Sequence, residues 1–170
     1  MEKFIKSIQK RFAYYKRVGE KAIEQVMDKQ LFLKPSPEST SISIIVNHLH
    51  GNMLSRWTNF YTEDGEKEWR NRDSEFDDII HSRNDLQTKW NEGWDCLFDI
   101  INDLSVEDLK KEITIRGEKH SVIDAINRQL THYAYHIGQI VYIAKLYKDN
   151  QWKSLTIPKG KSKEFNKRLR

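Results

Sequence analysis

Two histidines one helical turn apart are the residues whose spacing points most directly to chemistry. His132 and His136 stand in the segment LTHYAYHIGQIVYI, which is apolar and compatible with a helix. Residues at positions i and i+4 project from the same side of a helix, so both imidazole rings can supply nitrogen ligands to one metal ion at low conformational cost. The spacing therefore predicts part of a metal site.

A third ligand must come from another helix, and His48 is the strongest candidate. On a helical wheel His132 and His136 lie at one flank of their apolar stripe, and His48 lies at a flank of its own stripe. Bundle metal sites are built from facing helices at such positions. Residue chemistry alone does not separate His48 from His50, although Asn52, one turn after His48, offers a hydrogen-bonding partner for a ligand.

An ordinary interpretation of the histidine pair also has to be weighed. Two histidines at this spacing are often exposed, or bonded to polar neighbours, without any ion. The apolar and aromatic surroundings of His132 and His136 indicate that the two rings have binding partners, because two buried neutral imidazoles without partners would be unfavourable. We therefore expect either a metal ion or a polar network at this place.

Long helices are expected to position these histidines, since the chain has only 7 glycines and 3 prolines. Apolar residues at three- and four-residue spacing predict four of them. Their expected ranges are 2–29, 41 or 43 to 61, 78 or 82 to 104, and 122–147. The pattern predicts an all-α fold, a four-helix bundle with a long loop at 63–78 after the second helix and a short extended segment or hairpin at 112–120 before the last.

Length and composition favour one domain with its own core. The 170 residues are expected to form a single domain, 1–170, with 149–170 as a C-terminal tail that docks on the bundle. A lone cysteine, Cys96, fits a reducing cytosol. No stretch is typical of a signal peptide or a membrane span, so we expect a cytoplasmic protein with no membrane partner. The net charge of +4, concentrated in the tail, comes without a nucleic-acid-binding motif, so no nucleic-acid partner is expected.

Two histidine-containing segments together resemble a known family. The segment SIIVNHL at 43–49 and the segment HYAYHIGQI at 132–140 resemble the DinB/YfiT-like metalloprotein superfamily. The segments GNMLSRWT, DGEKEWRNRD and WKSLTIPKG further resemble a Bacillus-type subfamily of uncharacterised proteins. The resemblance covers nearly the whole chain.

The resemblance implies a four-helix bundle in which three histidines bind a divalent metal ion, often nickel or zinc. By motif match these are His48, His132 and His136, whereas His50 is not at a ligand position. Positions on the ion stay open to water or substrate. Members of the superfamily include thiol transferases, a thiol-dependent isomerase and suspected hydrolases, and many are homodimers, so a homodimer is expected here.

The first hypothesis for function is a metal-dependent thiol S-transferase. An open three-histidine site can bind a low-molecular-weight thiol, bacillithiol or a similar one, and lower its pKa for attack on a small electrophile. Arg56, Arg70 and Arg72 are candidates to pair with carboxylates of such a thiol, with ordinary surface charge as the alternative. Cys96 is not expected to be a nucleophile, because it lies in an apolar helix.

Two other functions remain open. The same site could activate water in a metal-dependent hydrolase, for which only Asp124 and Glu118 are local candidates for the base, at unconvincing spacing. A non-catalytic stress-response protein that binds a metal or a small molecule is the third possibility.

Overall fold

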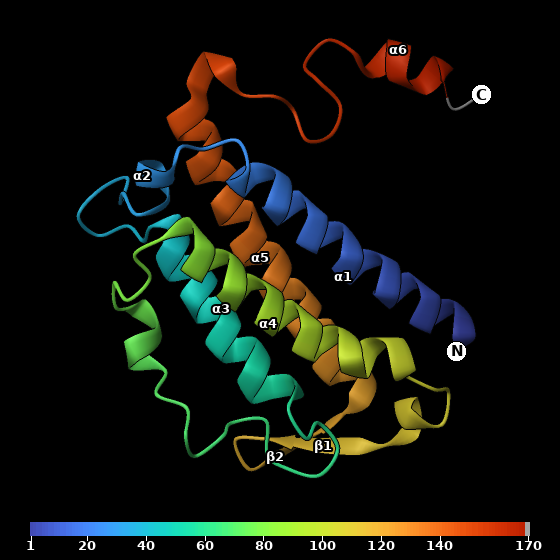
Figure 1. Cartoon of the computed structure of the whole chain (residues 1–170). Coiled ribbons are helices and arrows are strands. Elements are labelled where there is room, and N and C mark those ends of the chain that lie inside the picture. Colours follow the sequence, from blue (N-terminus) through green and yellow to red (C-terminus); the bar gives the residue numbers. More distant parts are fainter. Residues whose placement is uncertain (169–170) are drawn as a thin grey trace.

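Four long helices carry most of the chain in this computed structural model, which describes residues 1–168. They are α1 (Glu2–Ile23), α3 (Ile42–Trp57), α4 (Arg83–Asp103) and α5 (Val122–Lys148). The four lie side by side (Figure 1), with the most extensive packing between α3 and α4 and between α1 and α5. The predicted all-α fold is confirmed.

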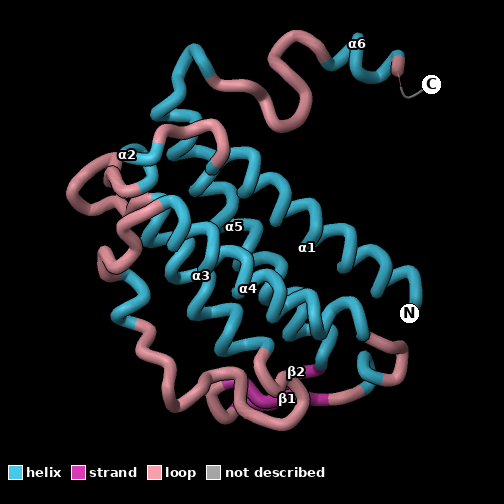
Figure 2. The backbone as a smooth tube through the Cα atoms, in the orientation of Figure 1, coloured by secondary structure: helices cyan, strands magenta, loops and turns pink. Residues whose placement is uncertain are grey.

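Shorter elements connect and flank the long helices. The helical ones are α2 (Asp28–Leu31), α6 (Ser162–Lys167) and the 3-10 segments η1 (Asp73–Phe76), η2 (Asp108–Lys110) and η3 (Asp149–Gln151). Two antiparallel strands, β1 (Glu112–Ile115) and β2 (Glu118–Ser121), form a hairpin at one end of the long helices (Figure 2). The short extended segment expected at 112–120 is therefore confirmed.

Serine caps fix where three of the long helices begin. Ser41, Ser82 and Ser121 precede α3, α4 and α5, and each hydroxyl accepts the backbone N–H of the third residue that follows. Such a cap satisfies one of the N–H groups left unpaired at a helix start. The sequence placed these starts within a few residues.

The first two helices end earlier than predicted. Helix α1 stops at Ile23 instead of continuing to residue 29, and the turn that follows leads into α2. Arg83 stabilises this turn, because its guanidinium donates to the carbonyls of Ile23 at 3.2 Å and Val26 at 2.7 Å. Helix α3 ends at Trp57, and Asn59 just beyond it has a positive φ of 49°.

One aromatic side chain from each long helix meets in the core. Phe12 of α1 lies 6.1 Å from Trp57 of α3 and 6.1 Å from Tyr133 of α5, measured between ring centroids, and Trp94 of α4 lies 6.0 Å from Tyr133. The Trp57 indole donates to the Tyr133 hydroxyl, which donates to the Asn52 side-chain oxygen at 3.1 Å. The core thus joins the helices by packing and by a satisfied polar chain.

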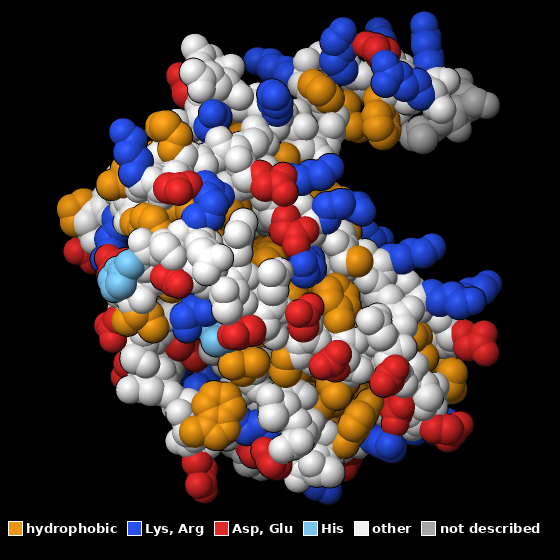
Figure 3. Space-filling model, in the orientation of Figure 1, with side chains coloured by type: hydrophobic (Ala, Val, Ile, Leu, Met, Phe, Trp, Pro, Cys, Tyr) orange, Lys and Arg blue, Asp and Glu red, His pale blue; other side chains and the backbone are white. Residues whose placement is uncertain are grey.

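The C-terminal segment touches the helices at its beginning. Trp152 and Leu155 are half-buried against the core, and Lys153 exchanges two backbone hydrogen bonds with the Gln25 side chain. Helix α6 is exposed, and basic side chains gather along it and along α1 (Figure 3). The tail predicted at 149–170 includes two final residues that lie outside the described part of the chain.

None of the helices formed by the described residues is both long and apolar enough to cross a bilayer.

Candidate metal centre

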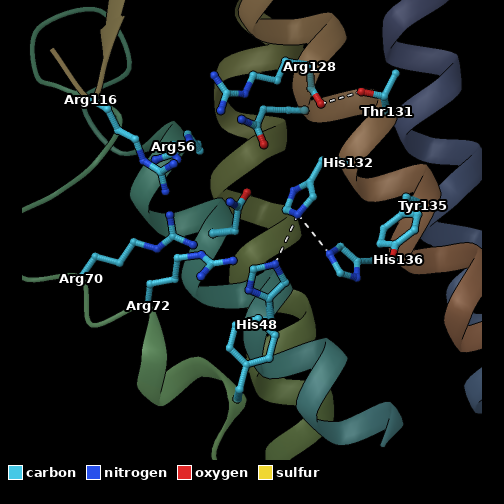
Figure 4. Close-up of a pocket in the computed structure, with 13 residues that line it drawn as sticks. His48, Arg56, Arg70, Arg72, Arg116, Arg128, Thr131, His132, Tyr135 and His136 are labelled. Atoms are coloured by element: carbon cyan, nitrogen blue, oxygen red, sulfur yellow. Dashed lines mark hydrogen bonds between the residues drawn. The ribbon is translucent and has the colours of Figure 1, made fainter. Parts of the chain in front are cut away.

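Three histidine side chains converge between α3 and α5. The His132 Nε2 atom lies 3.3 Å from the Nε2 of His48 and 3.1 Å from the Nε2 of His136. One ring nitrogen from each of the three histidines lies within 4.8 Å of the corresponding nitrogens of the other two. Figure 4 shows the three rings turned toward a common point. The structure therefore brings together the three residues singled out as candidate ligands.

A buried carboxylate orients His48. The Nδ1 atom of His48 lies 2.8 Å from Oε2 of Glu75, which belongs to η1. Burial alone would raise the pKa of Glu75, but hydrogen bonds from His48 and Arg70 outweigh it and hold that pKa below its usual value. An ionised carboxylate can only accept, so His48 carries a proton on Nδ1. In the neutral tautomer with this proton, the lone pair is on Nε2, the atom that faces the other histidines.

Two residues close to His48 in the sequence also hold the segment that carries Glu75 in place. Asn47 donates its side-chain amide to the backbone carbonyl of Glu75 at 3.0 Å. Gly51, one turn after Asn47, leaves the space that the Glu75 side chain fills, because a Cβ at this position would lie 2.8 Å from the Glu75 carboxyl carbon. Asn47, His48 and Gly51 thus act together to bind and position one glutamate.

His136 is oriented in a similar way by its own helix. Its Nδ1 lies 2.7 Å from Oε1 of Gln139, and the Gln139 amide nitrogen donates to the Tyr135 hydroxyl at 3.1 Å. With the Gln139 amide turned to donate to Tyr135, its oxygen accepts from His136 Nδ1–H. His136 then also presents an unprotonated Nε2.

The environment keeps two of the rings neutral. Burial, reinforced by the neighbouring histidines and by Arg56 and Arg70, lowers the pKa of His132 to about 3. Burial and His48 lower the pKa of His136 to about 4, against the opposing hydrogen bond from Gln139. Neutral imidazoles are the form that binds metal ions.

The arrangement fits a divalent metal ion. Two imidazole nitrogens that bind one ion at about 2.0–2.1 Å with a tetrahedral angle lie about 3.3–3.4 Å apart, close to the separations found around His132. In the neutral rings, the Nε2 lone pairs of His48 and His136 both face the Nε2 atom of His132. That atom carries at most one hydrogen, so it can donate to only one of the two. Nitrogen donors of this kind suit zinc and nickel.

The histidines line a cavity of about 870 Å³. Its walls combine the three histidines, five arginines and neutral polar or aromatic side chains. The lining residues are His48, Asn52, Arg56, Arg70, Arg72, Phe76, Arg116, Arg128, Gln129, Thr131, His132, Tyr135 and His136. A volume of this size accommodates a small organic molecule beside the histidines.

Other residues considered from the sequence lie elsewhere or have different partners. His50 pairs with Glu92 and does not line the cavity. Asn52 lines the cavity, but its side-chain oxygen accepts a hydrogen bond from the Tyr133 hydroxyl instead of bonding to His48. Burial raises the pKa of Cys96, as expected for an unreactive thiol.

Sequence reasoning missed Glu75, Gln139 and Arg128. Gln139 stands three residues after His136, a spacing at which helical side chains meet, so its role was open to prediction. Arg128 lies one turn before His132 and could have been found by the same rule. Glu75 lies in the loop segment 63–78, where no periodicity indicates which side chain turns inward.

Comparison with known proteins places the chain in a family. The model of a family described as "Protein of unknown function (DUF1572)" matches residues 1–161. The chain belongs to this family. DUF1572 is DinB-like, which agrees with the resemblance at the level of the superfamily. A comparison with curated proteins finds no match.

Proposed function

We propose that His48, His132 and His136 bind one divalent metal ion, nickel or zinc, and that the protein is a metal-dependent enzyme acting on a small molecule in the adjoining cavity. The observation that carries this proposal is the convergence of three Nε2 atoms, two of them at 3.1 and 3.3 Å from His132. Three protein nitrogens leave a position for substrate, as in catalytic zinc sites.

Transfer of a low-molecular-weight thiol, of the bacillithiol type, to a small electrophile is the reaction that the cavity supports best. When bound, the ion would lower the pKa of a coordinated thiol. Among the described residues the cavity lining holds no cysteine, lysine or carboxylate, which favours a nucleophile that a substrate brings. In the reaction the thiol sulfur bonds to the electrophilic carbon, the leaving group departs with its electron pair, and the thiol proton passes to solvent.

The residues that line the cavity support hydrolysis less well than thiol transfer. A hydrolase of this type needs a base near the attacked atom. Asp124 pairs with His120 at 3.0 Å, and neither Asp124 nor Glu118 lines the cavity. Glu75 is fully engaged by His48 and Arg70. A metal- or ligand-binding stress-response protein without catalysis remains the outcome if no turnover is found.

We further propose that the four long helices form a four-helix bundle of the DinB/YfiT-like type, within the Bacillus-type subfamily that the sequence resembles. The extensive pairing of α3 with α4 and of α1 with α5 supports this. We also propose a cytoplasmic homodimer without a nucleic-acid or membrane partner.

A conjugation assay tests the proposed reaction. Nickel- or zinc-loaded protein is incubated with bacillithiol and a panel of small electrophiles, and conjugates are measured by mass spectrometry. We expect metal-dependent product that disappears after chelation and in His132→Ala, and persists in His81→Ala, a matched change of an exposed histidine outside the cavity. Turnover of esters or amides without thiol would instead support the hydrolase, and metal-loaded protein inactive in every assay would contradict an enzymatic role.

A further inference from the structure

The cavity carries more positive than negative charge. Five arginines line it, and no acidic side chain of the described residues does. Two glutamates just behind the lining, Glu66 and Glu75, are the only carboxylates that pair with these arginines in the described part of the chain. Five guanidinium groups against two carboxylates leave a surplus of positive charge that attracts an anion.

Arg56 and Arg70 are occupied by the protein itself. Arg56 donates to the backbone carbonyl of Gly65 and to Glu66, and burial lowers its pKa. Arg70 donates to both oxygens of Glu75, at 2.7 and 3.0 Å. Burial opposes the charge on Arg70, but Glu75 and Glu66 outweigh it and raise its pKa. Both side chains therefore brace the loop that carries Glu75.

Arg72 and Arg128 are different, because neither forms an ion pair within residues 1–168. The guanidinium carbon of Arg72 lies 5.5 Å from the centroid of the Phe76 ring, and this ring stacks on His48 at 4.9 Å. Arg128 lies on α5 one turn before His132. Figure 4 shows Arg72 reaching toward the histidines from one side while Arg128 extends above them.

We propose that Arg72 and Arg128 bind a carboxylate or phosphate group of the substrate and so hold it beside the three histidines. This deepens the proposed function and rests on it for the role of the bound molecule, although the anion site itself needs no metal. Guanidinium groups form paired, charge-assisted hydrogen bonds with both kinds of anion. A small molecule that carries at least one such group is therefore the substrate class we infer.

Calorimetric titration of the full chain with two probes tests this anion site. Succinate represents carboxylates and inorganic phosphate represents phosphates, each at constant ionic strength and with metal-free protein, so that chelation by the probes does not interfere. The test variant is Arg72→Gln combined with Arg128→Gln. The matched control is Arg11→Gln combined with Arg17→Gln, which removes the same charge from exposed positions on α1 away from the cavity.

We expect the wild type and the control to bind at least one probe, and the test variant to bind it about tenfold more weakly or not at all. Binding of succinate alone identifies a carboxylate site, and binding of phosphate alone identifies a phosphate site. Absence of binding by the folded wild type, or equal binding by both double variants, would overturn the proposal. Circular dichroism confirms that each variant is folded.

Metal content measured on the same preparations keeps the two proposals apart. Protein that binds an anion through Arg72 and Arg128 but takes up no nickel or zinc would contradict the metal centre and leave the anion site intact. Protein that takes up one ion per chain but binds neither probe would contradict only the anion site.

Discussion

At the scale of single residues, the site depends on side chains that do not themselves face the proposed ion. Glu75 fixes the proton of His48 on Nδ1, and Gln139 does the same for His136. Such partners make the ligand nitrogen more basic and hold the ring in place. The chemistry of the three histidines is therefore set by a loop residue and by a helix residue beyond them.

Replacing Glu75 by glutamine tests this positioning role. Glu75→Gln keeps the shape of the side chain but removes its negative charge, so we expect the affinity for zinc to fall by about 10- to 100-fold. Competition with a chromophoric chelator measures the affinity. The control is Glu92→Gln, which alters the exposed carboxylate that pairs with His50 and should leave zinc affinity unchanged. Equal affinity in all three proteins would contradict the role of Glu75.

At the scale of elements, the site is assembled by packing η1 against α3. Asn47 bonds to the Glu75 backbone, and Gly51 admits the Glu75 side chain. Helix α5 supplies the remaining two histidines, and its position relative to α3 is fixed by the aromatic core. A glycine inside α3 would otherwise only weaken the helix.

An alanine at position 51 should disturb this contact. The added Cβ would lie 2.8 Å from the Glu75 carboxyl carbon, so Glu75 has to move away from His48. We expect Gly51→Ala to lower the free energy of unfolding by about 1–3 kcal/mol and to weaken zinc binding. Gly138→Ala is the control: no atom from elsewhere in residues 1–168 lies within 4 Å of its Cβ, and its helix should gain about 0.5–1 kcal/mol. Because Gly138 lies on the same face of α5 as Tyr135 and Tyr142, the comparison is made on monomeric protein. Urea unfolding measures both, and a stabilised Gly51→Ala with unchanged zinc affinity would refute the packing argument.

Some elements could be predicted from the sequence and others could not. Helix starts were close to the predicted residues because Ser41, Ser82 and Ser121 are local signals. The predicted end of α1 was wrong, because the turn after Ile23 is stabilised by Arg83, which lies sixty residues away in the chain. The histidine pair followed from spacing within one helix. The partnership of Glu75 with His48 depends on how a loop folds back on a helix, which no periodic pattern encodes.

Across the whole protein, one face of α5 is left uncovered by residues 1–168. Tyr135, Tyr142 and Leu146 are 62%, 69% and 52% exposed. Their spacing of seven and four residues places them on the same side of the helix. Large exposed apolar side chains that share a face are typical of an interaction surface. This face supports the proposed homodimer.

Light scattering tests the dimer. We expect the wild type to have the mass of two chains at micromolar concentration and Tyr142→Glu to have the mass of one, because a buried unpaired carboxylate is strongly unfavourable at an interface. Tyr14→Glu, on α1 and 38% exposed, should remain dimeric. A monomeric wild type would contradict the proposal, and a dimeric Tyr142→Glu would exclude this face as its interface.

X-ray absorption spectroscopy of zinc-loaded protein, combined with elemental analysis, tests whether His48, His132 and His136 hold one metal ion. We predict about one ion per chain, bound by three imidazole nitrogens at about 2.0–2.1 Å, with that signal lost in His48→Ala, His132→Ala and His136→Ala and kept in His81→Ala. If the protein takes up no ion, or if the ligands of the ion stay the same after each of the three substitutions, these histidines do not form a metal site.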